Sequence, residues 1–321
     1  MKLPSLQKAG PVRTVALSPP HVHGQYLFVS TDDRGWLFAW PSGRLETQIR
    51  ETPILEALFK PDGLLALCGA KHVHMVGLPK LDDRPSSKRV STIGVPGACW
   101  LHGDRLVTAS YSPGRALLLD FMGNRLATLP ATGDSVWGVA TNDRLIAIHS
   151  DVLTVWDDLT LTPVGSAKVH GPIEGQGIAR FHLGPRTRRL RSPMPAVFAL
   201  GFTPSGTTLV TAGADGRVVV WDPQQVAPRA IHTVYGHDGR PLDPRRVVLP
   251  DERRAYLTST TGLTRVELDT GRSDVLVRFQ PHLYRWNTPI GADLSADRTR
   301  LFFAGLAGEI GVWNVRDDVR A

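Results

Sequence analysis

Apolar positions along the chain occur in short runs or alternate with polar ones, and Gly, Pro, Asp, Asn and Ser separate the runs. Alternation with a period of two is typical of strands that bury one face, whereas an amphipathic helix places apolar residues three and four positions apart. Long patterns of the helical kind are missing. The sequence therefore predicts an all-β protein built from many short strands.

The segment 196–222 gives the clearest pattern. It reads AVFALGFTPSGTTLVTAGADGRVVVWD, which predicts three strands joined by turns at 204–206 (Pro-Ser-Gly) and 214–216 (Ala-Asp-Gly). An Asp-Gly pair suits a tight hairpin because glycine tolerates a positive φ.

The same unit recurs along nearly the whole chain. Its third predicted strand ends in a large apolar residue, the anchor, at Trp40, Val76, Leu119, Trp156, Trp221, Leu268 and Trp313. Neighbouring anchors lie 36 to 47 residues apart, except for one interval of 65 residues between Trp156 and Trp221. A period of about 40–45 residues is typical of a propeller blade, and the long interval predicts an insertion of roughly twenty residues.

Segment 196–222, with its Asp-Gly turn and its final Trp221-Asp222, resembles a WD40 repeat. The resemblance implies a seven-bladed, WD40-like β-propeller with four antiparallel strands per blade, in which residues 1–9 supply the missing outer strand of the last blade. Three of the seven anchors are not Trp, and Gly-His occurs once, at 236–237. We therefore expect apolar packing, rather than the family's His–Ser/Thr–Asp–Trp hydrogen-bond network, to hold the blades together.

This alignment predicts a single domain over residues 1–321. The expected blades are approximately 10–48, 49–90, 91–130, 131–170, 194–236, 237–280 and 281–321, the last completed by 1–9. An Arg-rich insertion at 171–193 separates the fourth blade from the fifth. One four-stranded sheet cannot bury both of its faces, so neighbouring blades stack, and a closed ring leaves only short sheet edges.

Charge changes this picture at one place. The formal net charge is +7, and the insertion alone holds five Arg against one Glu. Loops longer than about 12–15 residues in a compact domain are usually functional or disordered. The WD40 resemblance implies that the insertion shares one face, the top, with the predicted loops at 236–246 and 280–289. The partner-binding residues expected on this basic, aromatic face are Arg186, Arg188, Arg189, Arg191, Arg240, Tyr284, Arg285 and Trp286.

Arg and exposed aromatic side chains are the types that anchor protein interfaces, and the Arg fork pairs with carboxylates and phosphates. The leading interpretation is a non-catalytic scaffold that binds a protein partner, of acidic character, as a subunit of a larger complex. A nucleic-acid or phosphate binder that uses the same face is the first alternative. The remaining interpretation gives this face no binding function: the Arg-rich loop is merely solvated, and Trp286 packs on its own blade.

A propeller hydrolase or lactonase is the second alternative. Among the strands predicted to line the channel, the carboxylates are Glu56 and Asp293, and a pair of carboxylates can perform acid–base chemistry. Small apolar residues surround both, which favours a structural or solvated role. No G-x-S-x-G elbow, H-E-x-x-H helix or phosphate-binding G-x-x-x-x-G-K-[ST] loop occurs. We therefore expect neither enzyme activity nor a cofactor.

Two histidine pairs, His21 with His23 and His72 with His74, have the spacing that puts two imidazoles on one side of a strand. Zinc needs a third or fourth ligand, and the blade pattern places the two pairs apart, so no metal site is expected.

The two cysteines, Cys68 and Cys99, occur in apolar runs and are expected to be buried thiols. Two thiols do not make a disulfide framework, which favours a reducing compartment such as the cytoplasm. No run approaches about 20 apolar residues and the first residues contain no apolar run, so neither a membrane span nor a secretory signal is expected.

Overall fold

Every regular element that the structure describes is a β-strand. The structure, a computed structural model, describes residues 12–20, 24–31, 34–49, 54–60, 62–69, 72–77, 86–89, 97–110, 114–132, 136–142, 144–150, 152–168, 170, 179–183, 186–190, 197–279, 291–304 and 310–316. These residues contain 29 strands in eight antiparallel sheets. None of them forms a helix long and apolar enough to cross a membrane.

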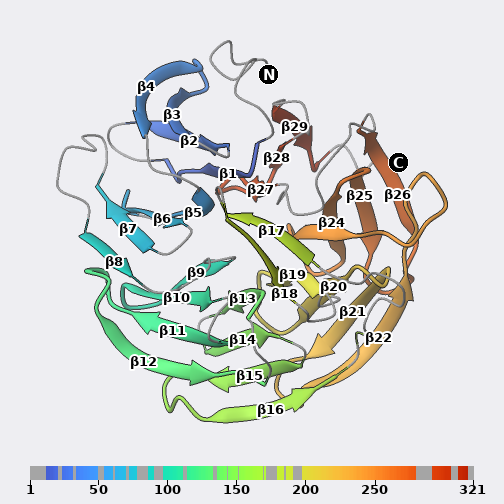
Figure 1. The fold of residues 1–321 in the computed structure, drawn as a ribbon. Helices are drawn as coiled ribbons and strands as arrows, with labels where there is room; N and C mark the ends of the chain where they lie inside the picture. The colour runs from blue at the N-terminus through green and yellow to red at the C-terminus, as the bar shows by residue number, and fades with distance from the viewer. Residues whose placement is uncertain are drawn as a thin grey trace.

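Seven of the sheets are the blades of a ring, and in each the strands pair in chain order (Figure 1). Blade 1 contains β1 (Thr14–Leu17), β2 (Gln25–Ser30), β3 (Gly35–Trp40) and β4 (Arg44–Ile49). Blade 2 contains β5 (Ile54–Phe59), β6 (Leu65–Gly69), β7 (His72–Val76) and β8 (Ser86–Arg89). Blade 3 contains β9 (Ala98–Leu101), β10 (Arg105–Ser110), β11 (Arg115–Leu119) and β12 (Arg125–Pro130). Blade 4 contains β13 (Gly138–Thr141), β14 (Leu145–His149), β15 (Leu153–Asp157) and β16 (Pro163–Ala167).

The second half of the ring follows the same plan. Blade 5 contains β19 (Val197–Phe202), β20 (Leu209–Gly213), β21 (Arg217–Asp222) and β22 (Ala227–Thr233). Blade 6 contains β23 (Pro244–Val248), β24 (Arg254–Ser259), β25 (Gly262–Glu267) and β26 (Ser273–Arg278). The described part of blade 7 contains β27 (Ala292–Leu294), β28 (Arg300–Ala304) and β29 (Ile310–Asn314). The eighth sheet is a hairpin between blades 4 and 5, formed by β17 (Ala179–Leu183) and β18 (Arg186–Leu190).

The predicted seven-bladed, all-β propeller is therefore confirmed. Six of the seven anchors lie at or next to the end of the third strand of their blade, and Leu268 directly follows β25. The predicted N-terminal strand at residues 1–9 lies outside the described residues, and the single-domain boundary remains a prediction.

The hydrophobic core lies between the blades. Each cluster of buried side chains joins neighbouring blades, so that Trp221 of blade 5 packs with Leu153 and Val155 of blade 4. Similar clusters join blades 1 and 2, 2 and 3, 3 and 4, and 5 and 6. Since each blade buries its two faces against its neighbours, apolar packing runs around the ring as expected.

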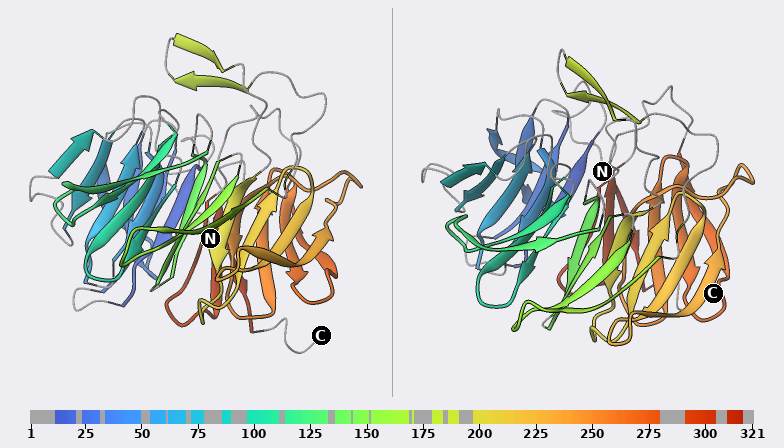
Figure 2. Two further views of the ribbon diagram at one scale, coloured as in Figure 1. Left: turned by 90° about the horizontal axis from the view of Figure 1, so that it is seen from below. Right: turned by 60° about the horizontal axis from the view of Figure 1, so that its bottom comes forward.

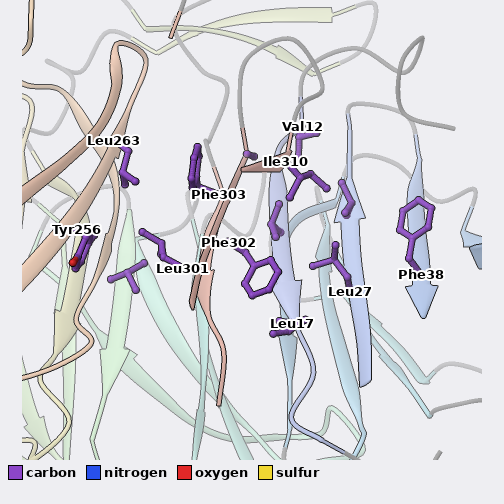
Figure 3. Close-up of a cluster of buried hydrophobic side chains, with 14 of the residues drawn as sticks. Val12, Leu17, Leu27, Phe38, Tyr256, Leu263, Leu301, Phe302, Phe303 and Ile310 are labelled. Atoms are coloured by element: carbon purple, nitrogen blue, oxygen red, sulfur yellow. The ribbon is translucent and has the colours of Figure 1, made fainter. Parts of the chain in front are cut away.

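The largest cluster joins the last two blades to the first. In Figure 3, Tyr256 and Leu263 of blade 6 lie near Leu301 and Phe303 of blade 7, with Leu17 of blade 1 beyond them. Trp40 of blade 1 also meets the ring of Phe302 edge-on, with centroids 4.8 Å apart. This cluster brings the two ends of the described chain together and closes the ring.

Both predicted turns of segment 196–222 form. Gly206 and Gly216 have φ values of +71° and +76°, and their N–H groups donate to the carbonyls of Thr203 and Gly213 at 2.8 and 3.0 Å. A Cβ on Gly216 would also lie 2.7 Å from Cβ of Pro241. Glycine is needed there both for the left-handed backbone and for the close approach of the next turn.

Antiparallel order defines two faces of the ring. All first strands begin at one end, called here the upper face, and run to the other end, the lower face, where they turn into the second strands. The turns between second and third strands return to the upper face, so residues that precede a first strand and residues of these turns meet there.

Candidate functional site

The predicted insertion contains the β17–β18 hairpin and joins the chain before β19, at the upper face. Figure 2 shows this hairpin beyond one face of the ring rather than within it. Its two strands pair only with each other among the described residues. The segment expected to be a loop is therefore partly a β-hairpin.

Cross-strand register sets two arginines of the hairpin opposite each other. Arg180 stands opposite Arg189, whereas Arg188 stands opposite Phe181. Arg186 pairs with Leu183 at the tip. Like charges directly opposite each other destabilise an antiparallel pair.

The other predicted contact residues divide between described and undescribed parts of the chain. Arg240 is exposed in the turn before β23, where its carbonyl accepts the N–H of Gly236 at 2.8 Å. Tyr235, in the same turn, is 53% exposed and is an aromatic residue that sequence reasoning missed. Arg191, Tyr284, Arg285 and Trp286 lie outside the described residues.

Two arginines predicted to lie in the loop at 236–246 belong instead to the strand β23. Arg245 is 7% exposed, and its Nη2 pairs with Asp243 at 2.6 Å. Arg246 forms an ion pair with Glu56 of blade 2. The loop assignment was wrong because proline and aspartate at 241–244 look like turn residues, whereas β23 begins at Pro244 itself. A proline is tolerated at the first position of a strand.

Glu56 and Asp293 line one cavity in the centre of the ring, together with Arg246. Burial lowers the pKa of Arg246 to about 10, although the negative charge of Asp293 opposes this shift. Burial raises the pKa of Asp293 to about 6, although backbone N–H groups and Arg246 oppose this shift. The small apolar residues expected around the two carboxylates are present, at Ala57, Ala98 and Ala292, and Arg246 lies in the same cavity wall.

A hydrogen-bond network in blade 5 also departs from expectation. Nε1 of Trp221 donates to Oγ1 of Thr211 at 2.9 Å, and that hydroxyl lies 2.9 Å from Nε2 of His170. Nδ1 of His170 lies 3.0 Å from the carboxylate of Asp215. Each group has a partner if Nδ1 of His170 carries the proton. The indole N–H then donates to the hydroxyl of Thr211, this hydroxyl donates to Nε2 of His170, and the Nδ1–H donates to the carboxylate of Asp215.

Burial would raise the pKa of Asp215, but the hydrogen bond and charge of His170 outweigh it and lower the pKa below the usual value. The expectation that packing alone holds the blades was thus wrong for blade 5. His170 stands directly before the insertion and 27 positions before Val197, so the sequence separates it from its blade. One sequence signal could have predicted this network. It is a histidine at the start of an insertion, followed by Thr, Asp and Trp at the spacing of a blade.

Neighbouring histidines do not gather into a metal centre. The rings of His72 and His74 have centroids 5.9 Å apart, whereas His21 and His23 lie outside the described residues. Across the described ranges, no group of three or more His, Cys, Asp or Glu side chains is placed to hold a metal ion.

Cys68 and Cys99 are free thiols. Burial raises the pKa of both, to about 12 for Cys99. Thiols with such pKa values are protonated at neutral pH and are poor nucleophiles. Cys68 packs between blades 2 and 3, and Cys99 packs against the cluster between blades 3 and 4.

Comparisons with known proteins add one match. The family model described as the WD domain, G-beta repeat (WD40), matches residues 186–222, from β18 to the end of β21. A search of curated proteins finds no match. The matched repeat contains Thr211, Asp215 and Trp221 of the network, and six further blades repeat its strand order around the ring. The chain is therefore a seven-bladed β-propeller that contains a WD40 repeat, and propellers with this repeat are generally non-catalytic scaffolds.

Proposed function

We propose that the protein is a non-catalytic scaffold that binds an acidic protein partner through its upper face, as one subunit of a larger assembly. The proposed contact surface, called the basic upper surface, consists of Arg186, Arg188, Arg189, Arg191, Arg240, Tyr284, Arg285 and Trp286. The two free thiols, of which Cys68 is buried and Cys99 partly buried, support the cytoplasm, a reducing compartment, as its location.

The observation that carries this proposal is the register of the β17–β18 hairpin. It sets Arg180 opposite Arg189 and puts two more arginines on the same short strand as Arg189. Carboxylates of a partner would relieve the repulsion and accept paired hydrogen bonds from the guanidinium forks. The ring is a rigid base for such a surface, because buried apolar contacts join each blade to its neighbours.

The test compares the wild-type protein with a variant in which Arg186, Arg188, Arg189 and Arg191 are all Ser. A matched control replaces four exposed arginines elsewhere, Arg44, Arg125, Arg253 and Arg272, which changes the net charge equally. Proteins captured from the native cell are identified by mass spectrometry and quantified. We expect capture of the main partner to fall about tenfold for the first variant and to stay unchanged for the control.

A second measurement addresses nucleic acid. Short single- and double-stranded oligonucleotides are run on gels with the wild-type protein over a range of salt concentrations. Retardation that is lost steeply as the salt concentration rises would indicate that the surface binds a phosphate backbone rather than a protein partner. Equal capture by all three proteins would refute the basic upper surface.

A further inference from the structure

The central cavity reaches the lower face of the ring. Its wall includes Pro19, Phe59 and Ala296, which end or follow the first strands of blades 1, 2 and 7. It also includes Ala98 and Ala292, the first residues of β9 and β27. First strands run from the upper to the lower face, so the cavity follows them over most of their length.

The ionisable side chains of the cavity wall carry one more negative than positive charge. They are Glu56, Asp293 and Arg246, in a protein whose net charge is +7. Arg246 forms its ion pair with Glu56. An anion would meet a guanidinium that is already neutralised, whereas a cation would meet an excess carboxylate.

Asp293 is the carboxylate available to a ligand. Among the described residues, its hydrogen-bond donors are the backbone N–H groups of Leu17 at 2.9 Å and Leu294 at 2.8 Å. These two bonds fix the orientation of the carboxylate, and the guanidinium of Arg246, which is paired with Glu56, also acts on its charge. The remaining lone pairs of the two oxygens are free to accept hydrogen bonds from a cation.

Size and wall chemistry limit the ligand further. The cavity has a volume of about 260 Å³, which corresponds to roughly nine water molecules at about 30 Å³ each. Most of its wall is aliphatic or aromatic, as at Val15, Leu58 and Phe59. A wall of mostly apolar side chains that also carries two carboxylates and one guanidinium favours a short hydrocarbon stem that ends in a positive charge.

We propose that this cavity binds a small aliphatic cation, a primary amine or a guanidine, whose charged end pairs with Asp293 and whose stem contacts the apolar wall. A metal ion does not suit the site, because two carboxylates, one of them paired with Arg246, are too few ligands. The same chemistry is offered by a free amine and by a Lys or Arg side chain of a peptide.

The test measures binding by calorimetry and by the thermal shift of the full-length protein. Cadaverine and agmatine are the cationic probes, and glutarate is the anionic probe. The neutral probe is 1,5-pentanediol, which has the carbon chain of cadaverine with hydroxyl groups in place of the amines. We expect both cations to bind at least about tenfold more tightly than glutarate or the diol. A blocked peptide with one Lys between glycines identifies the source: tighter binding than cadaverine indicates a peptide side chain, and weaker binding indicates a free amine.

Two variants and two controls make the result decisive. Asp293→Asn removes the excess charge, and Ala296→Phe adds a large side chain to the cavity wall from an exposed turn position. Both should reduce cadaverine binding about tenfold or more. Asp269→Asn, at an exposed turn of blade 6, should leave it unchanged. The variant with four serines in the insertion should also bind normally, which separates this site from the upper face.

Several results would overturn the proposal. They are the absence of binding by either cation up to about 10 mM, glutarate binding as tight as cadaverine binding, and cadaverine binding that survives in both Asp293→Asn and Ala296→Phe.

Discussion

Blades 4 and 5 solve the same packing problem in different ways. Each buries a third-strand tryptophan against the preceding blade, Trp156 against blade 3 and Trp221 against blade 4. The residue opposite the tryptophan is Ile146 in one blade and Leu209 in the other. Two residues further along the second strand, blade 5 has Thr211 whereas blade 4 has Ile148.

The polar interactions of the two tryptophans differ as well. Thr211 links the indole of Trp221 to His170, and His170 reaches Asp215. In blade 4 the Nε1 of Trp156 has no hydrogen-bond partner within the described residues. A tryptophan can therefore anchor a blade through apolar burial alone, while a network contributes more only when all of its members are present.

The largest expected effect comes from breaking the network at its centre. Thr211→Val keeps the shape but leaves the indole N–H of Trp221 and Nε2 of His170 unpaired in the interior, while Nδ1 of His170 keeps its bond to Asp215. At about 1–3 kcal/mol for each unpaired group, we expect the free energy of unfolding to fall by about 3 kcal/mol. Denaturant unfolding followed by tryptophan fluorescence measures the change.

Thr108 of blade 3 provides the matched control. It is buried on the corresponding second strand, β10, and its hydroxyl has no partner among the described residues. Thr108→Val should change the free energy of unfolding by less than about 0.5 kcal/mol or increase it. Equal losses for the two substitutions would contradict the role assigned to the network.

Acid should weaken the junction between the two blades. His149 of blade 4 packs edge-on against His170, with ring centroids 6.2 Å apart, and burial together with the charge of His170 lowers its pKa to about 3. In the unfolded chain His149 has its ordinary pKa of 6.5, so below that pH it binds a proton that it does not bind in the folded protein. Stability is therefore present above pH 6.5 and is lost as the pH falls toward 3.

Between pH 7 and pH 5 this linkage amounts to about 2 kcal/mol for the wild-type protein. His149→Leu removes the titrating group while His170 and Asp215, which face it, remain. Unfolding free energies at both pH values should show a smaller acid loss for the variant by about that amount. Parallel pH profiles would exclude His149 as the sensor.

The two tryptophans themselves offer a direct comparison. Trp221→Phe loses ring volume and the hydrogen bond to Thr211, whereas Trp156→Phe loses volume and removes an unpaired N–H. We expect the loss of stability to be larger for Trp221→Phe by about 1 kcal/mol. A larger loss at Trp156 would show that packing outweighs the network even in blade 5.

Removal of the hairpin should have the smallest effect. Replacing residues 179–190 by a Gly-Ser linker removes β17 and β18, which pair only with each other in the described structure. With His170 retained, the free energy of unfolding should change by less than about 0.5 kcal/mol. Thermal unfolding of the two proteins tests this, and a loss above about 2 kcal/mol would mean that the hairpin packs on the ring.

Local patterns in the sequence were enough to predict the strands, the repeat and the anchors. Alternation and turn chemistry act between residues a few positions apart, so segment 196–222 could be divided into its strands and turns correctly. They could not show that β23 already begins at Pro244, because a proline and an aspartate there look like turn residues. Nor could they assign His170 to blade 5, because the insertion separates the histidine from the strands that it contacts.

By itself, the sequence determined that this protein is a ring of seven β-blades with an Arg-rich insertion after the fourth, because periodic burial and Gly-containing turns are local properties of a chain. Only the tertiary structure decided which distant side chains meet. The pairing of Glu56 with Arg246 joins blades 2 and 6 through the centre of the ring. The contact of His170 with Thr211 spans the insertion. Ring closure brings these residues together, and no local pattern encodes contacts at that separation.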